Sequence, residues 1–306
     1  MADTNVKWGY ISVIIATLLY GIYNTFSKIL LQDLDPLAIS ALVYCIAGIF
    51  LFTVRFSGLN NKLMGILDSK METETFMTRK DYIIILFTAI SGSVIAPVIY
   101  LKGLNNITAV NASLLMNVEV LFIILIGISI LKEKFQKKEL IGLIFIILGT
   151  VLLATNGNIN SISITESIGT LFIIISAFFW SIDTTFSKFL SHKRDLLFIS
   201  ATKCSIGGII LLILALIFDV NLRVPINHLP YLLFIGLFSI GFTFVMILFS
   251  IRKIGSTRTG SLFPISSLFG ALFAFLILKE PFTFMQFIYG ILMILGVLII
   301  YKFQNK

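Results

Sequence analysis

The sequence predicts an all-α membrane protein with ten transmembrane helices, arranged as two inverted five-helix repeats. Three observations lead to this fold class. First, the 306 residues are 58% hydrophobic and only 12% charged, with a mean hydropathy of +1.03. Soluble domains carry about 25% charged residues, so this chain has too little polar surface to face water on every side. Second, the apolar residues form ten separate runs, and third, a motif occurs twice.

Each apolar run is close to the roughly 20 residues that cross a bilayer, and polar residues mark its ends. The first five predicted spans are Trp8–Leu30, Pro36–Phe56, Tyr82–Leu101, Ile107–Leu131 and Leu140–Ala154, and the second five are Ile168–Leu190, Leu196–Phe218, Leu229–Ile251, Thr257–Leu278 and Phe282–Tyr301. The first run lacks a small-residue cleavage site and is followed at once by others, which indicates a true span. The polar connector 156–166 separates a first repeat, 1–155, from a second, 167–306.

The repeated motif is TFSK, which occupies Thr25–Lys28 and, 160 positions later, Thr185–Lys188. Further on, Leu131-Lys132-Glu133 matches Leu278-Lys279-Glu280 at an offset of 147. Two collinear blocks in the same order favour a duplication. A five-span unit ends on the side opposite to its start, so the second copy must be inverted. Inverted repeats are typical of secondary transporters, in which two similar halves expose a midplane site to each side in turn.

Most Lys and Arg residues occupy the loops that would share one side of the membrane if the N-terminus is cytoplasmic. The positive-inside rule therefore predicts a multi-pass plasma-membrane protein with both termini in the cytoplasm. The formal net charge of +8 does not indicate a nucleic-acid partner, because the charges are spread over these short loops. Cys45 and Cys204 both lie inside apolar runs, so the sequence implies no disulfide framework.

The segment Asn111–Phe135, NASLLMNVEVLFIILIGISILKEKF, resembles the signature helix of the EamA family in the drug/metabolite transporter superfamily. Glu119 matches the family's Glu, whereas Val120 replaces its usual Pro. The second copy, Gly260–Phe282, has Ser266 and the following serine where Glu-Pro is common. The resemblance covers nearly the whole chain. It implies a ten-span fold with inverted halves and the export of amino acids or related metabolites, without fixing the substrate.

Three ionisable residues inside predicted spans are the strongest functional candidates: Glu119, Asp183 and Lys203. Each costs about 2.5–3.5 kcal/mol at the centre of a membrane helix on the insertion scale, so each needs a compensating role. One interpretation is that they pair with one another and fix helix packing. The other is that they line a water-accessible substrate cavity. The two interpretations are compatible.

Polar and aromatic residues extend this candidate site. Tyr20, Asn24 and Ser27 share one face of the first span by their i, i+4, i+7 spacing, and interhelical hydrogen bonding is the alternative explanation. Pro97 predicts a bend in the third span, after which Tyr100 could point into a vestibule. The predicted substrate-binding residues are Tyr20, Asn24, Tyr100, Glu119, Trp180, Asp183 and Lys203. Tyr20 and Trp180 could instead be ordinary packing residues.

No nucleotide-binding, metalloprotease or serine-hydrolase motif occurs in the sequence, so we expect no catalysis, no cofactor and no metal site. Lys28 and Lys188 lie at helix ends, where snorkelling to the interface explains them. Glu133 and Glu280 end their spans and are expected to have structural or gating roles.

The buried charges favour a zwitterionic or cationic small molecule as substrate. Lys203 would take a carboxylate, and Glu119 or Asp183 an amino group; a buried acid could also carry protons as the coupling ion. One alternative is an exporter of organic cations or drugs that uses the two acids and the aromatic rings of Tyr20 and Trp180. A carrier of sugar phosphates is less favoured because it would need several Lys or Arg together. A membrane enzyme or non-transporting scaffold is the alternative from another class.

Overall fold

We describe the protein from a computed structural model, in which residues 2–57, 77–130, 132, 138–155, 164–190, 196–254, 258–259 and 262–304 are placed. Every regular element in these ranges is helical, which confirms the all-α prediction for them. The elements of the first half are α1 (Ala2–Leu30), α2 (Pro36–Phe56), α4 (Arg79–Ala89), the π-helix η1 (Ile90–Ile95), α5 (Ala96–Asn106), α6 (Ala109–Leu115), the 3-10 helix η2 (Met116–Val118), α7 (Glu119–Ser129) and α8 (Glu139–Ala154). The remaining elements are α9 (Ile164–Ser187), η4 (Lys188–Leu190), α10 (Leu196–Ile217), η5 (Ile226–His228), α11 (Leu229–Phe234), the π-helix η6 (Ile235–Phe242), α12 (Thr243–Ile254), α14 (Ile265–Phe273), the π-helix η7 (Ala274–Leu278) and α15 (Phe284–Gln304).

Seven helical stretches within the described ranges are long and apolar enough to cross a membrane. They are Val6–Leu30, Pro36–Phe56, Arg79–Asn106, Ala109–Ser129, Ile164–Ser187, Leu197–Ile217 and Ile226–Ile247. Three further apolar helices, Glu139–Ala154, Ile265–Leu278 and Phe284–Ile300, are shorter. All ten coincide with predicted spans, but length and composition support only the seven, so the number ten stays a prediction.

Local sequence signals explain several helix starts. Asp35 caps α2, because its Oδ1 accepts a hydrogen bond from the backbone N of Leu37 at 2.7 Å, and Pro36 occupies the first turn, where a missing N–H costs nothing. At the start of α4, the Asp81 carboxylate accepts from the backbone N of Thr78 at 2.6 Å and from its hydroxyl at 2.7 Å. These caps satisfy groups that would otherwise remain unpaired at a helix end.

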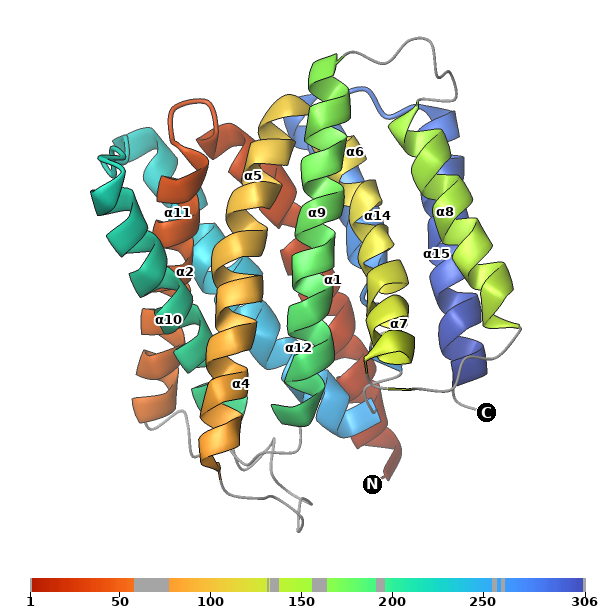
Figure 1. Cartoon of the computed structure of the whole chain (residues 1–306), viewed down its shortest axis with the longest axis horizontal. Coiled ribbons are helices and arrows are strands. Elements are labelled where there is room, and N and C mark those ends of the chain that lie inside the picture. Colours follow the sequence, from red (N-terminus) through yellow and green to blue (C-terminus); the bar gives the residue numbers. More distant parts are fainter. Residues whose placement is uncertain are drawn as a thin grey trace.

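The helices form one bundle, and the start of α1 and the end of α15 point toward the same end of it, which we call the terminal end (Figure 1). At the opposite, far end, Nζ of Lys28 in the last turn of α1 donates to the carbonyl of Ile107, just after α5. The start of α9 also lies there, since a Cβ on Gly169 would be 2.6 Å from a methyl of Ile107. Helices α1 and α9 therefore run in opposite directions.

Contacts between the two halves are reciprocal. Helix α2 packs against α10, where a Cβ on Gly48 would lie 3.0 Å from the backbone N of Ser205, and a Cβ on Gly208 would lie 2.7 Å from that of Cys45. Gly208 follows Gly48 by 160 positions, and Ser205 follows Cys45 by the same number. Exchanging the halves therefore maps one close contact onto the other.

A second reciprocal contact lies at opposite ends of the bundle. A Cβ on Gly9 near the start of α1 would lie 2.7 Å from a methyl of Ile254 in α12, and Gly169, 160 positions later in α9, meets Ile107 in the corresponding way. Ile107 and Ile254 are 147 positions apart, the offset of the later sequence block. The Gly9 contact lies toward the terminal end and the Gly169 contact at the far end.

Candidate functional site

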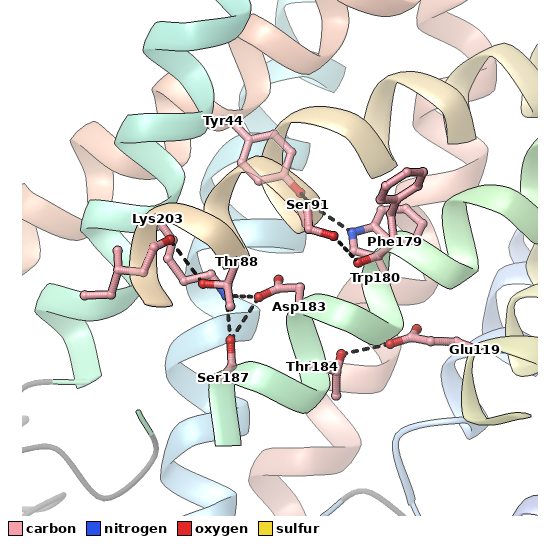
Figure 2. Close-up of polar contacts among 12 residues, drawn as sticks. Tyr44, Thr88, Ser91, Glu119, Phe179, Trp180, Asp183, Thr184, Ser187 and Lys203 are labelled. Carbon is pink, nitrogen blue, oxygen red and sulfur yellow. Dashed lines mark hydrogen bonds and ion pairs between the residues drawn. The ribbon is translucent and has the colours of Figure 1, made fainter. Parts of the chain in front are cut away.

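Two of the three predicted charged residues form an ion pair. Nζ of Lys203 in α10 contacts Oδ1 of Asp183 in α9, and their side chains are 10% and 16% exposed (Figure 2). Nζ also donates to Oγ of Ser187 at 2.9 Å, and that hydroxyl donates to Oδ1 of Asp183 at 2.9 Å. Ser187 lies one helical turn after Asp183, so α9 presents both groups to Lys203. We call these three residues the charged cluster, and its two charges neutralise each other.

Glu119 lies apart from this cluster. Its Oε1 accepts a hydrogen bond from the hydroxyl of Thr184 in α9 at 2.9 Å (Figure 2). Glu119 is the first residue of α7, which continues without a break from α6 and η2. The prediction that the charged residues pair with one another therefore holds for Lys203 and Asp183, while Glu119 is held by a neutral hydroxyl.

The face of α9 that carries Thr184 changes character along its length. Ile173, Ala177 and Thr184 lie on one face by their i, i+4, i+11 spacing. Ile173 and Ala177 are fully buried, but Thr184, toward the terminal end, is exposed. The inward face of α9 is thus covered by other helices in its first half and accessible beside Glu119.

Trp180 of α9 is held by a main-chain acceptor in η1. Its Nε1 donates to the carbonyl of Gly92 at 3.0 Å, and the Tyr44 hydroxyl in α2 donates to the same oxygen at 3.2 Å (Figure 2). Next to it, Oγ of Ser91 donates to the carbonyl of Phe179 at 2.7 Å. Pro97 lies in the first turn of α5, directly after this π-helical segment, and the bend at Pro97 stays a prediction.

Asn24 and Tyr100 form a separate, closed network. The Tyr100 hydroxyl donates to Oδ1 of Asn24 at 2.5 Å, and Nδ2 of Asn24 donates to Oγ of Ser113 at 2.6 Å. Tyr100 is 1% and Asn24 is 6% exposed. In this structure Tyr100 therefore packs inside the bundle and does not line an open vestibule; a role of either residue in substrate binding stays a prediction.

A row of aromatic rings joins the first half to the second. Tyr20 stacks on Tyr23 at 5.9 Å between ring centroids, Tyr23 lies 6.1 Å from Tyr100, and Tyr100 lies 5.2 Å from Trp180. The row thus runs from α1 through α5 to α9. It brings together four of the predicted residues, because Asn24 bonds to Tyr100 within it.

Sequence reasoning missed Tyr23, Tyr44, Gly92 and Ser113. The i, i+3 spacing of Tyr20 and Tyr23 could have indicated the first. The five-residue spacing of Gly92 and Pro97 could have indicated the carbonyl acceptor, since proline lacks an N–H. The i, i+4 spacing of Ser40 and Tyr44 in α2 could have indicated Tyr44.

Charged residues at the far end bind main-chain groups. Nζ of Lys28 donates to the carbonyls of Leu104 and Ile107 at 2.5 and 2.8 Å, so this lysine caps the C-terminal end of α5. Snorkelling of Lys28 to the interface stays a prediction. Oε2 of Glu280 accepts from the backbone N of Val110 at 3.0 Å, which supports its structural role. The Lys188 side chain and Glu133 lie outside the described residues.

His228 and Asp33 also meet at the far end, with Nε2 of His228 2.5 Å from Oδ2 of Asp33. In the described ranges, no group of three or more His, Cys, Asp and Glu residues could hold a metal ion.

The candidate site consists of three parts: the charged cluster, Glu119 with Thr184, and the aromatic row.

Known proteins resemble this chain in sequence and in fold. The model of the EamA-like transporter family matches it twice, over residues 7–155 and 167–302. An uncharacterized transporter of Methanothermobacter thermautotrophicus is 50% identical over 295 residues, covering 96% of this chain and 86% of the relative. The uncharacterized transporter YoaV of Bacillus subtilis is 26% identical over 94% of each chain. A solved crystal structure superimposes with a TM-score of 0.67 at 16% identity, covering 99% of both chains, and so shares the fold.

Proposed function

Because the chain belongs to the EamA-like transporter family, we propose that this multi-pass membrane protein exports amino acids or related small metabolites. Export would be secondary active transport by alternating access, in which a central site is exposed to each side of the membrane in turn. The observation that carries the proposal is the charged cluster, which places two opposite charges inside the spans on α9 and α10.

We propose ten spans in two inverted five-helix repeats, 1–155 and 167–306, joined by the connector 156–166. The reciprocal contacts of Gly48 with Gly208, and of Gly9 with Gly169, support this arrangement. The opposite directions of α1 and α9 and the two matches of one family model support it as well. With both termini in the cytoplasm, the terminal end would be the inner end, and exposed Thr184 would face an inward-open path to Glu119.

A zwitterion suits the charged cluster for an electrostatic reason. Separating Lys203 from Asp183 would leave two uncompensated charges in the membrane, at a cost of several kcal/mol each. A zwitterion can replace that pair, because its carboxylate binds Lys203 while its ammonium binds Asp183, and no net charge is added. Protons would be the coupling ion if one of the two acids, Glu119 or Asp183, takes up a proton when the substrate leaves.

Organic cations are the second candidate substrate class, favoured by one observation. Lys203 is already neutralised by Asp183, whereas Glu119 accepts a hydrogen bond from the neutral Thr184 hydroxyl. A cation could therefore bind Glu119 without displacing an internal charge, and a nearby aromatic face would add a cation–π contribution of about 0.5–2 kcal/mol. Sugar phosphates fit less well, because they want several basic groups together and the cluster combines Lys203 with an acid.

The test is efflux from proteoliposomes that contain the purified protein and an equimolar mixture of amino acids and amines, measured with and without a proton gradient. If amino acids leave the vesicles selectively and Lys203→Ala abolishes their efflux, a zwitterionic substrate is supported. Efflux of amines that survives Lys203→Ala but not Glu119→Gln would shift the assignment to cations. Ser266→Ala is the matched control, since Ser266 follows Glu119 by 147 positions and should tolerate the change. No efflux of any species would contradict both.

A further inference from the structure

The carbonyl of Gly92 is left without a partner from its own helix because of Pro97. In η1 the backbone N–H of Ala96 donates to the carbonyl of Ser91, five residues earlier. In the same register, the next bond would run from residue 97 to the carbonyl of Gly92. Proline has no N–H and cannot make it. Pro97 therefore releases one carbonyl oxygen inside the membrane, where an unsatisfied polar group costs several kcal/mol.

Two side chains from different helices satisfy this oxygen. Trp180 of α9 donates its indole N–H at 3.0 Å, and Tyr44 of α2 donates its hydroxyl at 3.2 Å. A carbonyl oxygen has two lone pairs, so it can accept both bonds at once. Figure 2 shows Tyr44 and Trp180 approaching the same segment from two sides. The oxygen thus fixes the orientation of an aromatic ring from each half of the chain.

Gly92 also packs directly against the charged cluster. A Cβ at this position would overlap the carboxylate of Asp183, so any side chain would displace that group. Ser91 adds a bond to the carbonyl of Phe179 at 2.7 Å. This segment therefore contacts α9 in three ways. Ser91 bonds to the main chain of α9, the Gly92 carbonyl accepts from Trp180, and the missing side chain of Gly92 leaves room for Asp183.

We propose that Gly92 and Pro97 are positioning residues of the substrate site. Pro97 keeps the Gly92 carbonyl free for Trp180 and Tyr44, and Gly92 admits the carboxylate of Asp183 beside them. Trp180 precedes Asp183 by three residues, which places the ring one helical turn away on a neighbouring face. An ammonium group bound at Asp183 would then lie beside an oriented indole, and the fixed ring would select amine-bearing substrates. The substrate part of this inference rests on the proposed function; the positioning part does not.

The test uses the fluorescence of Trp180. The chain has two tryptophans, so Trp8→Phe leaves Trp180 as the single indole fluorophore. In that background, Pro97→Ala supplies an N–H that competes for the Gly92 carbonyl. We expect the emission maximum of Trp180 to shift and its quenching by acrylamide to rise. Pro36→Ala is the control, because Pro36 occupies the first turn of α2, where a restored N–H has no helical acceptor.

A shift in Pro97→Ala that is absent in Pro36→Ala supports the proposal. Unchanged emission in Pro97→Ala, or the same shift in both variants, overturns it. If Pro97→Ala does not yield folded protein, Tyr44→Phe replaces it: removal of the second donor from the shared carbonyl should change Trp180 emission, and unchanged emission overturns the proposal. None of these fluorescence measurements requires transport. A negative efflux assay and a negative test of the roles of Gly92 and Pro97 are therefore separate results.

Discussion

The two halves of the chain pack alike but differ in the chemistry of equivalent positions. Gly48 in α2 and Gly208 in α10 make matching close contacts. At the same offset of 160, however, Asp183 corresponds to Tyr23, and Lys203 corresponds to Val43. The charged cluster therefore belongs to the second half, where the first half has an aromatic and an aliphatic residue. The two halves therefore share these packing contacts, while this pair of charges is present in only one of them.

The difference between the two halves also shows which contacts are energetically costly to keep inside a membrane. A close glycine contact is neutral and needs only the absence of a side chain, so both halves can keep it. A charge pair in a membrane is tolerated only when each partner compensates the other. Variants can test the two kinds of position separately.

The largest expected effect comes from breaking the charge pair. Lys203→Met leaves the Asp183 carboxylate inside the membrane without its counter-ion, which should cost about 3–5 kcal/mol of stability. Thermal melting in detergent measures it. The neutral pair Lys203→Met with Asp183→Asn should recover most of that loss. Equal melting temperatures for wild type and the single variant would mean that the pair contributes nothing to the fold.

Overpacking the shared helix contact should have the next largest effect. Gly48→Val and Gly208→Val should each destabilise by about 1–3 kcal/mol, because the added side chain meets backbone of the facing helix. The reciprocal geometry predicts similar costs for the two, measured by the same melting assay. Ile49→Val, at a side chain that is 68% exposed, is the control and should stay within about 0.5 kcal/mol. A large cost for only one of the two glycines would contradict the equivalence.

Removal of the lysine cap at the far end should have a smaller effect. Lys28→Met takes a cation away from the carbonyls of Leu104 and Ile107, so we expect a loss of about 1 kcal/mol. Lys102→Met, on an exposed lysine near the end of α5, serves as the control. If both substitutions change the melting temperature equally, general loss of charge, and not the cap, is responsible.

The smallest expected effect comes from two serines that make equivalent bonds. Ser91 donates to the carbonyl of Phe179, and Ser239 donates to that of Leu19, both at 2.7 Å, and the two acceptors are 160 positions apart. Each Ser→Ala change should cost about 0.6 kcal/mol, the average for such bonds in a membrane protein. Chemical denaturation in mixed micelles measures the free energy of unfolding of each variant. Unequal losses would mean that the two halves are equivalent at the glycine contacts but not at these serines.

The sequence alone predicts much of the fold, because span length and repeated motifs are local properties. The apolar runs coincide with helices, and the offsets of 160 and 147 recur in the contacts of Gly169 and Ile107. The partners inside the site were harder to predict. Lys203 could have met Glu119 or Asp183, and Asp183 is its partner because α9 and α10 both pack against α4 and η1.

Other site features depend on geometry that residue patterns do not carry. Pro97 marks a disturbed helix, but the π-helical register of η1 decides which carbonyl it releases. Tyr44 follows Ser40 by one helical turn, but this spacing does not show which oxygen the Tyr44 hydroxyl reaches. The location of Lys28 at a helix end does not show that it caps another helix, because the end of α5 comes near it only in the folded bundle.

The most direct test of the account is efflux of amino acids and amines from proteoliposomes that contain the neutral pair, Lys203→Met with Asp183→Asn. This variant should melt near the wild type, because no charge is left uncompensated, yet it should lose the efflux that wild-type protein shows. That result would tie the charges of the second half to the cargo. Undiminished efflux by the folded variant would contradict the account, because the charged cluster would then have no part in transport.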